Sequence, residues 1–217
     1  FLIVKRDVFG NVVSPKYDDD GDDPESGGAI AADDDLAVSI IGPDGEAMPC
    51  RVAPDYDQYA VSWAPSLAGR YSIAVKVDRD HILNSPFRVV VSPGPTCVPM
   101  CEVSGKIVES GRWHAGAVAK IKIRAMDQFG NQRVRGGDAW AVKFERLEED
   151  YRGVLAPNGE AFGVEKFEVK DNHDGSYTVA FTPYESGHCA VAIVSMNADS
   201  AGQHVRGSPV QFGIKFG

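Results

Sequence analysis

Apolar and polar residues alternate in short runs along the second half of the chain. Four such runs are Ile121 and Ile123; Trp140, Val142 and Phe144; Phe167 and Val169; and Tyr177, Val179 and Phe181. A period of two places alternate side chains on one face of a β-strand, so each run predicts a strand with a buried face. Cys189–Val194 is small and apolar on both faces, which is typical of a central strand, and Ser208-Pro209 precedes a last strand that reaches Ile214. No run has the period of a helix.

The first half of the chain gives a matching series of predicted strands. They are Phe1–Lys5, Leu36–Ile40, Cys50–Val52, Tyr59–Trp63, Tyr71–Val77 and Phe87–Val91. Ahead of its first matched strand, the second half has an additional segment that begins near Pro99 and includes Ile107 and Trp113. We therefore expect the chain to start inside a domain, either as a fragment of a longer array or because its first strand comes from elsewhere. Trp113 is interpreted as a core residue rather than as an exposed contact.

Three short motifs occur twice, in the same order. They are Asp7-Val8-Phe9-Gly10-Asn11 and Asp127-Gln128-Phe129-Gly130-Asn131; Tyr59–Pro65 and Tyr177–Pro183; and Asn84-Ser85-Pro86-Phe87 and Gly207-Ser208-Pro209-Val210. A repeat with nearly constant spacing indicates two copies of one domain of about 100 residues. The predicted domains are 1–92 and 100–217, joined by a linker at 93–99. Three prolines in that linker restrict its backbone and predict a semi-rigid joint.

Short strands separated by turns predict an all-β fold of two tandem antiparallel immunoglobulin-like β-sandwiches. Asp174-Gly175 supplies the positive φ that a tight hairpin needs between two of the runs. The disulfide of antibody domains is not predicted, because no cysteine lies near Ile121 or Ile123 to face Cys189. Cys97 and Cys101 would be roughly 13 Å apart along a strand, so only a tight turn could pair them.

The motifs of the second copy resemble the filamin-type immunoglobulin repeat over essentially the whole chain. In order they are Asp127–Asn131, Gly136-Gly137-Asp138, Asp171–Val179, Thr182-Pro183, Ser186-Gly187 and Gly207-Ser208-Pro209. The first copy departs from this pattern, because Pro54–Gln58 stands where the Asp-Gly turn would be and Asn84 replaces the glycine before Ser-Pro. The resemblance implies a non-enzymatic domain that uses the groove between its third and fourth strands to bind partner tails.

The net charge of −9 is concentrated in the first copy. Residues 1–95 hold 8 Lys and Arg against 16 Asp and Glu, and most of the acids lie in an insert at about 14–35. Such a field repels nucleic acid and anionic membranes and favours basic partners. The insert is interpreted as a solvated loop, with a contact to a basic partner or a metal site as alternatives; the spacing of a calcium loop is absent.

The second copy has its own insert of about 13 residues between Phe144 and Phe167. We expect Glu145–Tyr151 to form a short helical turn. The insert either covers a sheet edge or frames a docking site.

Catalytic and metal chemistry have little support in the sequence. The five histidines are scattered and have no ligand spacing with a second histidine or cysteine, and the glycines lie in turns rather than before helices. We therefore predict no enzyme activity, no cofactor and no metal. No apolar run approaches the roughly 20 residues that cross a bilayer.

Recognition by β-strand addition has a physical basis. When Trp140, Val142 and Phe144 face the core, small or flexible side chains face outward and leave the backbone accessible to an extended peptide. The predicted contact residues are Ala139, Ala141, Lys143, Phe167 and Val169, with Ala37 and Ser39 as a second groove in the first copy. The alternative is that small outward residues reflect packing alone.

These observations predict a scaffold module of a larger cytoskeletal or axonemal protein in the cytoplasm, the cytoskeleton or a cilium. Actin cross-linking is one such role. The partners of this module would be other proteins that offer extended peptide segments. The alternative is an extracellular adhesion module of a cell-surface protein. The absence of Asn-X-Ser/Thr sites and of a disulfide framework favours the intracellular interpretation.

Overall fold

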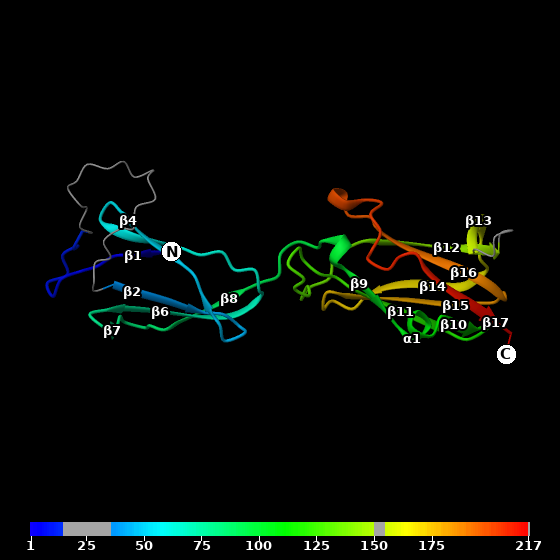
Figure 1. Ribbon diagram of the computed structural model, residues 1–217, viewed down its shortest axis with the longest axis horizontal. Coiled ribbons are helices and arrows are strands. Elements are labelled where there is room, and N and C mark those ends of the chain that lie inside the picture. The colour runs from blue at the N-terminus through cyan, green and yellow to red at the C-terminus, as the bar shows by residue number, and fades with distance from the viewer. Residues whose placement is uncertain (15–35, 150–154, 217) are drawn as a thin grey trace. The chain divides into compact units, whose positions relative to one another are not determined.

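The computed structural model describes residues 1–14, 36–149 and 155–216. The chain divides into two compact units, Phe1–Ser92 and Pro93–Gly217 (Figure 1). Except for its first residue, the predicted acidic insert lies outside the described residues.

The second unit is a sandwich of two sheets. Its strands are β9 Glu102–Ser104, β10 Arg112–His114, β11 Ala119–Arg124, β12 Trp140–Glu149, β13 Leu155–Ala161, β14 Val164–Asp171, β15 Ser176–Pro183, β16 Gly187–Ser195 and β17 Val210–Lys215. One sheet has the order β10-β17-β16-β12-β13 and the other β14-β15-β11-β9. The strand pairs are antiparallel except for β10 and β17, which are parallel. This confirms the predicted fold class.

Alternating residues of both sheets form the core of the second unit. Ile121, Val179 and Phe181 come from one sheet, while Val191 and Phe212 come from the other, and all five are at most 3% exposed. Each such side chain stabilises the fold by about 1.5 to 3 kcal/mol through burial of its apolar surface. The strands therefore follow the two-residue period of the sequence.

A segment ahead of β11 closes one side of this sandwich. It comprises a 3-10 helix Val98–Met100, β9, the short helix α1 Lys106–Ser110 and β10. Ile107 of α1 is fully buried, and the Trp113 indole packs against the core and donates its N–H to the Ala117 carbonyl. Helix α1 was not predicted, because one helical turn is too short to show a period in the sequence.

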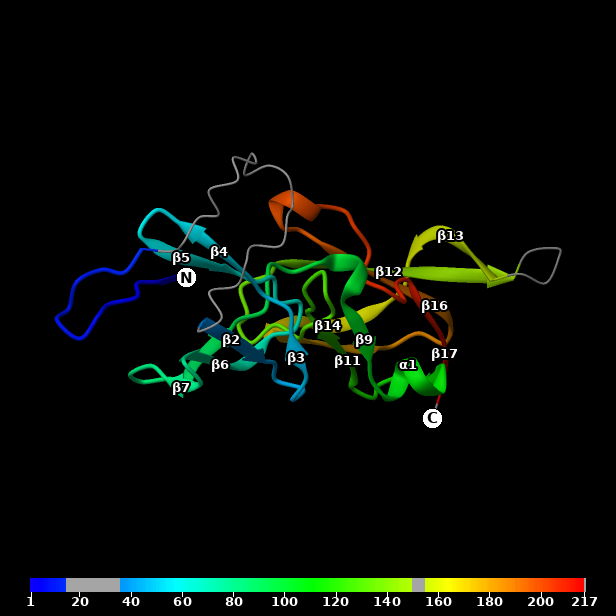
Figure 2. The same cartoon turned by 60° about the vertical axis from the view of Figure 1, so that its left-hand side comes forward.

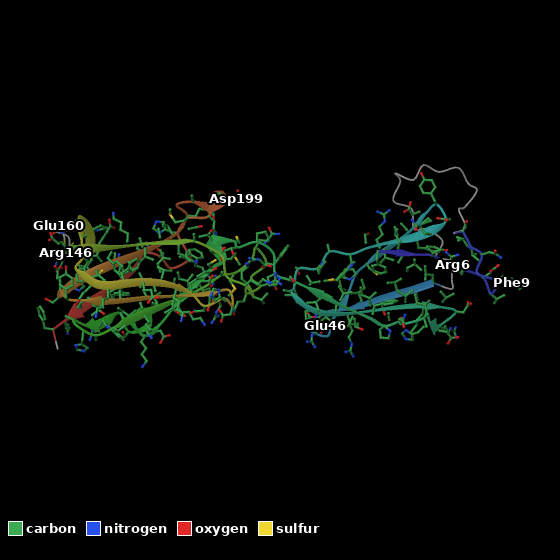
Figure 3. The ribbon with its side chains drawn as sticks, turned by 180° about the vertical axis from the view of Figure 1, so that it is seen from behind. Arg6, Phe9, Glu46, Arg146, Glu160 and Asp199 are labelled. Carbon is green, nitrogen blue, oxygen red and sulfur yellow. The ribbon has the colours of Figure 1, made fainter. Side chains whose placement is uncertain are left out.

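The insert of the second unit is a β-hairpin rather than a helical turn. Strand β12 continues through Glu149, and β13 pairs with it antiparallel (Figure 2). Arg146 forms ion pairs with Glu185 and Glu160, the latter at 3.7 Å between Nε and Oε2, and its guanidinium lies 5.3 Å from the centre of the Phe162 ring (Figure 3). These contacts with one arginine favour the extended conformation over a helix.

A tight turn at Asp171–Gly175 joins β14 to β15, as the sequence predicts. His173 and Gly175 both have positive φ, at 64° and 78°. A Cβ atom at Gly175 would lie 1.9 Å from the Arg133 carbonyl oxygen, so a glycine is required there.

The first unit repeats this arrangement with fewer strands. They are β1 Leu2–Ile3, β2 Leu36–Ile41, β3 Ala47–Met48, β4 Arg51–Asp55, β5 Gln58–Ser62, β6 Gly69–Val77, β7 Asp80–His81 and β8 Phe87–Val91. One sheet has the order β1-β5-β4; the other is β3-β2-β6-β7, with β8 also paired to β6. Ile40, Tyr59, Val61, Tyr71 and Val75 form the buried core.

The repeated Asp-X-Phe-Gly-Asn motif forms the same turn in both units. In each unit, the aspartate accepts the backbone N–H groups of the third and fifth residues of the motif. Asp127 is 1% exposed and also accepts the N–H of Gly94, whereas the Asp7 turn is exposed and Phe9 at its tip is 87% exposed (Figure 3). Burial by itself would raise the pKa of Asp127, but the hydrogen bonds from Asn131 and the backbone outweigh it and lower this pKa.

We predict that Asp127→Ala destabilises the second unit by about 2 to 4 kcal/mol, because several buried N–H groups lose their acceptor. The matched change Asp7→Ala in the exposed turn should cost less. Urea unfolding followed by the NMR signals of each unit measures both. Equal losses in the two units would contradict this account.

Acid should weaken the second unit through the same carboxylate. Since the folded pKa of Asp127 lies below its unfolded value of about 3.9, its stabilisation is present above that pH and is lost as the pH falls through the folded pKa. We expect the urea midpoint of the second unit to fall less between about pH 5 and pH 3 in Asp127→Asn than in the wild type. An identical fall would show that other groups carry the acid sensitivity.

Candidate protein-binding site

Among the described residues, no group of three or more His, Cys, Asp or Glu side chains could hold a metal ion. Two of the histidines share a structural role that sequence analysis missed. His81 and His204 each hydrogen bond to the serine four residues on, Ser85 or Ser208, and each serine hydroxyl also accepts a backbone N–H from the neighbouring strand. The pairs occupy equivalent places in both units, where they tie the start of the last strand to the sheet.

Strand β12 has an open edge in its first half. Strand β16 pairs with one side of β12 over Trp140–Leu147, while β13 pairs with the other side from Glu145 onward. No described strand pairs with that second side over Trp140–Phe144. The Phe144 carbonyl points to this side, where it accepts the N–H of Phe162. Alternate residues of a strand direct their backbone groups to the same side, so the backbone groups of Val142 also point to this second side of β12.

Strand β14 forms the facing edge of the other sheet. Within the described residues it pairs with β15 and has no second strand partner. Phe167 lies opposite Phe181 in the register, so its ring faces inward, yet it is 48% exposed because the sandwich is open beside it. Its ring meets that of Phe144 edge-on at 5.6 Å between centroids. We call the open sides of Trp140–Phe144 and β14 the β12–β14 edge.

The contact residues predicted in the second unit lie on or next to these two strands. Ala139, just before β12, is exposed; on the outer face of β12, Lys143 is exposed and Ala141 is half-buried, and Lys143 forms an ion pair with Glu145. Val169 is half-buried against the core. The added strand would extend the sheet beside β12. On the outer face of the sheet it would meet small and cationic side chains, and on the inner face it would meet Val142, Phe144 and Phe167.

The corresponding edge of the first unit lies along β2. Ala37 and Ser39 are exposed on β2, and β3 pairs with β2 at Ile40 and Ile41. The Cys50 thiol lies 3.9 Å from the Val38 carbonyl oxygen, and burial raises the pKa of this thiol. By strand register, Cys50 stands where the second unit has Phe167. The thiol therefore contacts the strand edge that a bound peptide would use.

A hollow of about 680 Å³ lies beside residues 94–99 in the second unit. Asp138 accepts hydrogen bonds there from Thr96, Tyr177 and Asn197. Burial raises the pKa of Tyr177. Because these polar groups pair with one another, they favour a structural role. Cys97 and Cys101 flank the 3-10 helix nearby, and all four cysteines of the chain are free thiols.

No helix in the described residues has the length and apolar character needed to cross a bilayer.

Known proteins share sequence with both halves of the chain. The Filamin/ABP280 repeat model matches residues 18–88 and 95–211. The E3 ubiquitin-protein ligase TRIM71 of Mus musculus is 37% identical over 99 residues, which cover 44% of this chain and 11% of that protein. Filamin-C of Rattus norvegicus is 28% identical over 159 residues, which cover 73% of this chain and 5% of that protein.

Among solved structures, the Lin-41 filamin domain matches with a TM-score of 0.40 and 14% identity, over 57% of this chain and 100% of that one. Because it covers 11% of TRIM71 and 5% of filamin-C, the chain spans a small part of the length of these curated relatives. The filamin repeat is a non-catalytic structural domain that mediates interactions between proteins. The chain belongs to the Filamin/ABP280 repeat family, with one match in each of its two units.

Proposed function

We propose that this chain is a non-enzymatic scaffold module that binds extended segments of partner proteins by β-strand addition at the β12–β14 edge. The observation that carries the proposal is the side of Trp140–Val142 that pairs with no described strand, which directs the backbone groups of Val142 outward beside the half-exposed ring of Phe167. A peptide strand would gain backbone hydrogen bonds from β12 and bury its alternate side chains on the two phenylalanines.

The second unit is the preferred site of the two. In the first unit, Cys50 contacts Val38 at the equivalent edge, so Ala37 and Ser39 form a secondary site. The aromatic rings of Phe144 and Phe167 offer more apolar surface to a partner than one thiol does. Lys143 favours an acidic residue on the outer face of the bound strand, where the carboxylate would compete with Glu145.

The module would serve within a larger protein of the cytoplasm or cytoskeleton, with cilia as a further setting. The match to filamin-C supports this setting, since filamin homologues are cytoskeletal and this relative aligns with 73% of the chain. The partners would be cytoskeletal or axonemal proteins, and the acidic residues of the first unit would favour basic ones.

Phe167 should matter little for stability and much for binding. We expect Phe167→Ala to lower the free energy of unfolding by about 1 kcal/mol, because half of the ring is already exposed, whereas Phe181→Ala should cost about 3 to 5 kcal/mol. Urea unfolding measures both changes. A loss of several kcal/mol at Phe167 would mean that its ring serves the core rather than a partner.

Peptide binding tests the site directly. Linear peptides selected from a random displayed library on the intact chain should bind the wild type and lose at least about tenfold in affinity with Ala141→Glu, which places a charge beside the open edge. The matched control is Ala192→Glu, which changes an outward alanine of β16 opposite Lys143, away from that edge. Peptides that bind both variants equally would contradict the proposed site.

A further inference from the structure

The five-stranded sheet of the second unit has a hollow of about 410 Å³ on its outer face. His188, Gly213 and Arg112 line it and lie opposite one another in the strand register. Their neighbours Cys189 and Phe212 face the core, so these three positions face outward. We call this hollow the Gly213 hollow. Its volume lies within the roughly 300 to 1,000 Å³ that is typical of sites for small ligands.

Gly213 lies at the middle of the hollow, and the fold does not require a glycine there. It lies inside strand β17 and is not among the glycines with positive φ. A Cβ atom at this position would lie 3.6 Å from the nearest atom of the His188 ring, which is an ordinary van der Waals distance. A glycine inside a strand weakens the strand and often marks a place where a ligand approaches the backbone closely. The position therefore has room for a side chain that it does not carry.

The first unit carries a side chain at the equivalent position. Ser85-Pro86 and Ser208-Pro209 are equivalent, so Gly213 corresponds to Val90 of β8, which is 69% exposed. Among its described residues the first unit also has no counterpart of Leu155, because β3 has two residues where β13 has seven. The hollow is therefore a feature of the second unit, formed by one glycine and by the β12–β13 hairpin.

The β12–β13 hairpin supplies an apolar wall. Leu147 of β12 lies opposite His188 in the register and so stands on the outer face, yet it is only 4% exposed. Leu155 of β13 lies opposite Glu149 on the same face and is half-buried. Both leucines line the hollow together with His188. A flat apolar group placed over Gly213 would contact these side chains and bury its surface against them.

The rim of the hollow is cationic. Arg112 lies opposite Gly213, Lys215 follows Gly213 by two residues on the same face of β17, and both cations are exposed. Within the described part of the chain, no Asp or Glu lines the hollow, and neither cation forms an ion pair. A guanidinium group binds carboxylates through paired N–H groups. The hollow therefore favours an anion that has an apolar body.

We propose that the Gly213 hollow binds a small organic anion, in which a carboxylate is attached to a flat apolar group. The apolar group lies over Gly213, between the His188 ring and the two leucines, and the carboxylate accepts hydrogen bonds from Arg112 and Lys215. A larger residue in place of the glycine would occupy the space of the ligand. This site does not depend on the β12–β14 edge, which lies along the open side of Trp140–Phe144.

The test uses the intact chain, with naphthalene-2-carboxylate as the probe and naphthalene-2-carboxamide as its neutral counterpart. We expect saturable binding of the carboxylate in an NMR titration, with amide shifts grouped around Gly213, and binding of the carboxamide at least about tenfold weaker. Gly213→Val should abolish binding and should not lower the urea midpoint, because valine suits a strand better than glycine does. Ala141→Glu, at the other candidate site, should leave binding of the probe unchanged.

A second arm tests the cationic rim. Arg112→Gln combined with Lys215→Gln should weaken binding at least about tenfold, whereas the matched change Lys120→Gln, at an exposed position of β11 in the other sheet, should not. The proposal is overturned if the carboxylate does not bind up to about 5 mM, if the carboxamide binds equally well, or if Gly213→Val binds like the wild type. It is also overturned if the peptides selected on the intact chain lose binding with Gly213→Val and not with Ala141→Glu, because the occupant is then a polypeptide.

Discussion

A two-sheet sandwich is stable only where the gap between its sheets is kept from water along both sides. The inner faces of the sheets are apolar, and their outermost strands carry backbone groups that need partners. In the second unit, β9, α1 and β10 close one side, while the β12–β13 hairpin and the Phe144–Phe167 contact cover part of the other. The β12–β14 edge is a place where this closure is incomplete.

Much of this architecture follows from the pattern of residues. The two-residue period locates the strands, because Ile121, Val179 and Phe181 alternate with exposed neighbours and are buried in the fold. The repeated motifs place equivalent turns at Asp7 and Asp127, and the resemblance to filamin repeats is confirmed by a family match in each half. These features are local, so a short stretch of sequence is enough to predict them.

Features that depend on long-range pairing could not be predicted in this way. Glu145–Glu149 has charged residues that are compatible with a helix, and its strand conformation results from pairing with β13 and β16. The contact of Cys50 with Val38 joins two sheets and leaves no local signal. At the candidate site, sequence alternation indicated which side chains of β12 face outward, but it could not show that β13 stops pairing at Glu145 and leaves the edge open.

The two units differ most where a neighbouring segment is bound to them. Gly94 donates its N–H to Asp127, and its carbonyl accepts a hydrogen bond from Arg133 at 2.6 Å. Cys97 donates its N–H to the Met126 carbonyl. The residues between Ser92 and the first strand of the second unit are therefore hydrogen bonded to that unit. The first unit has no such segment among its described residues, and its Asp7 turn is exposed. The burial of the Asp127 turn therefore depends on the residues that pack against it and is not determined by the turn sequence alone.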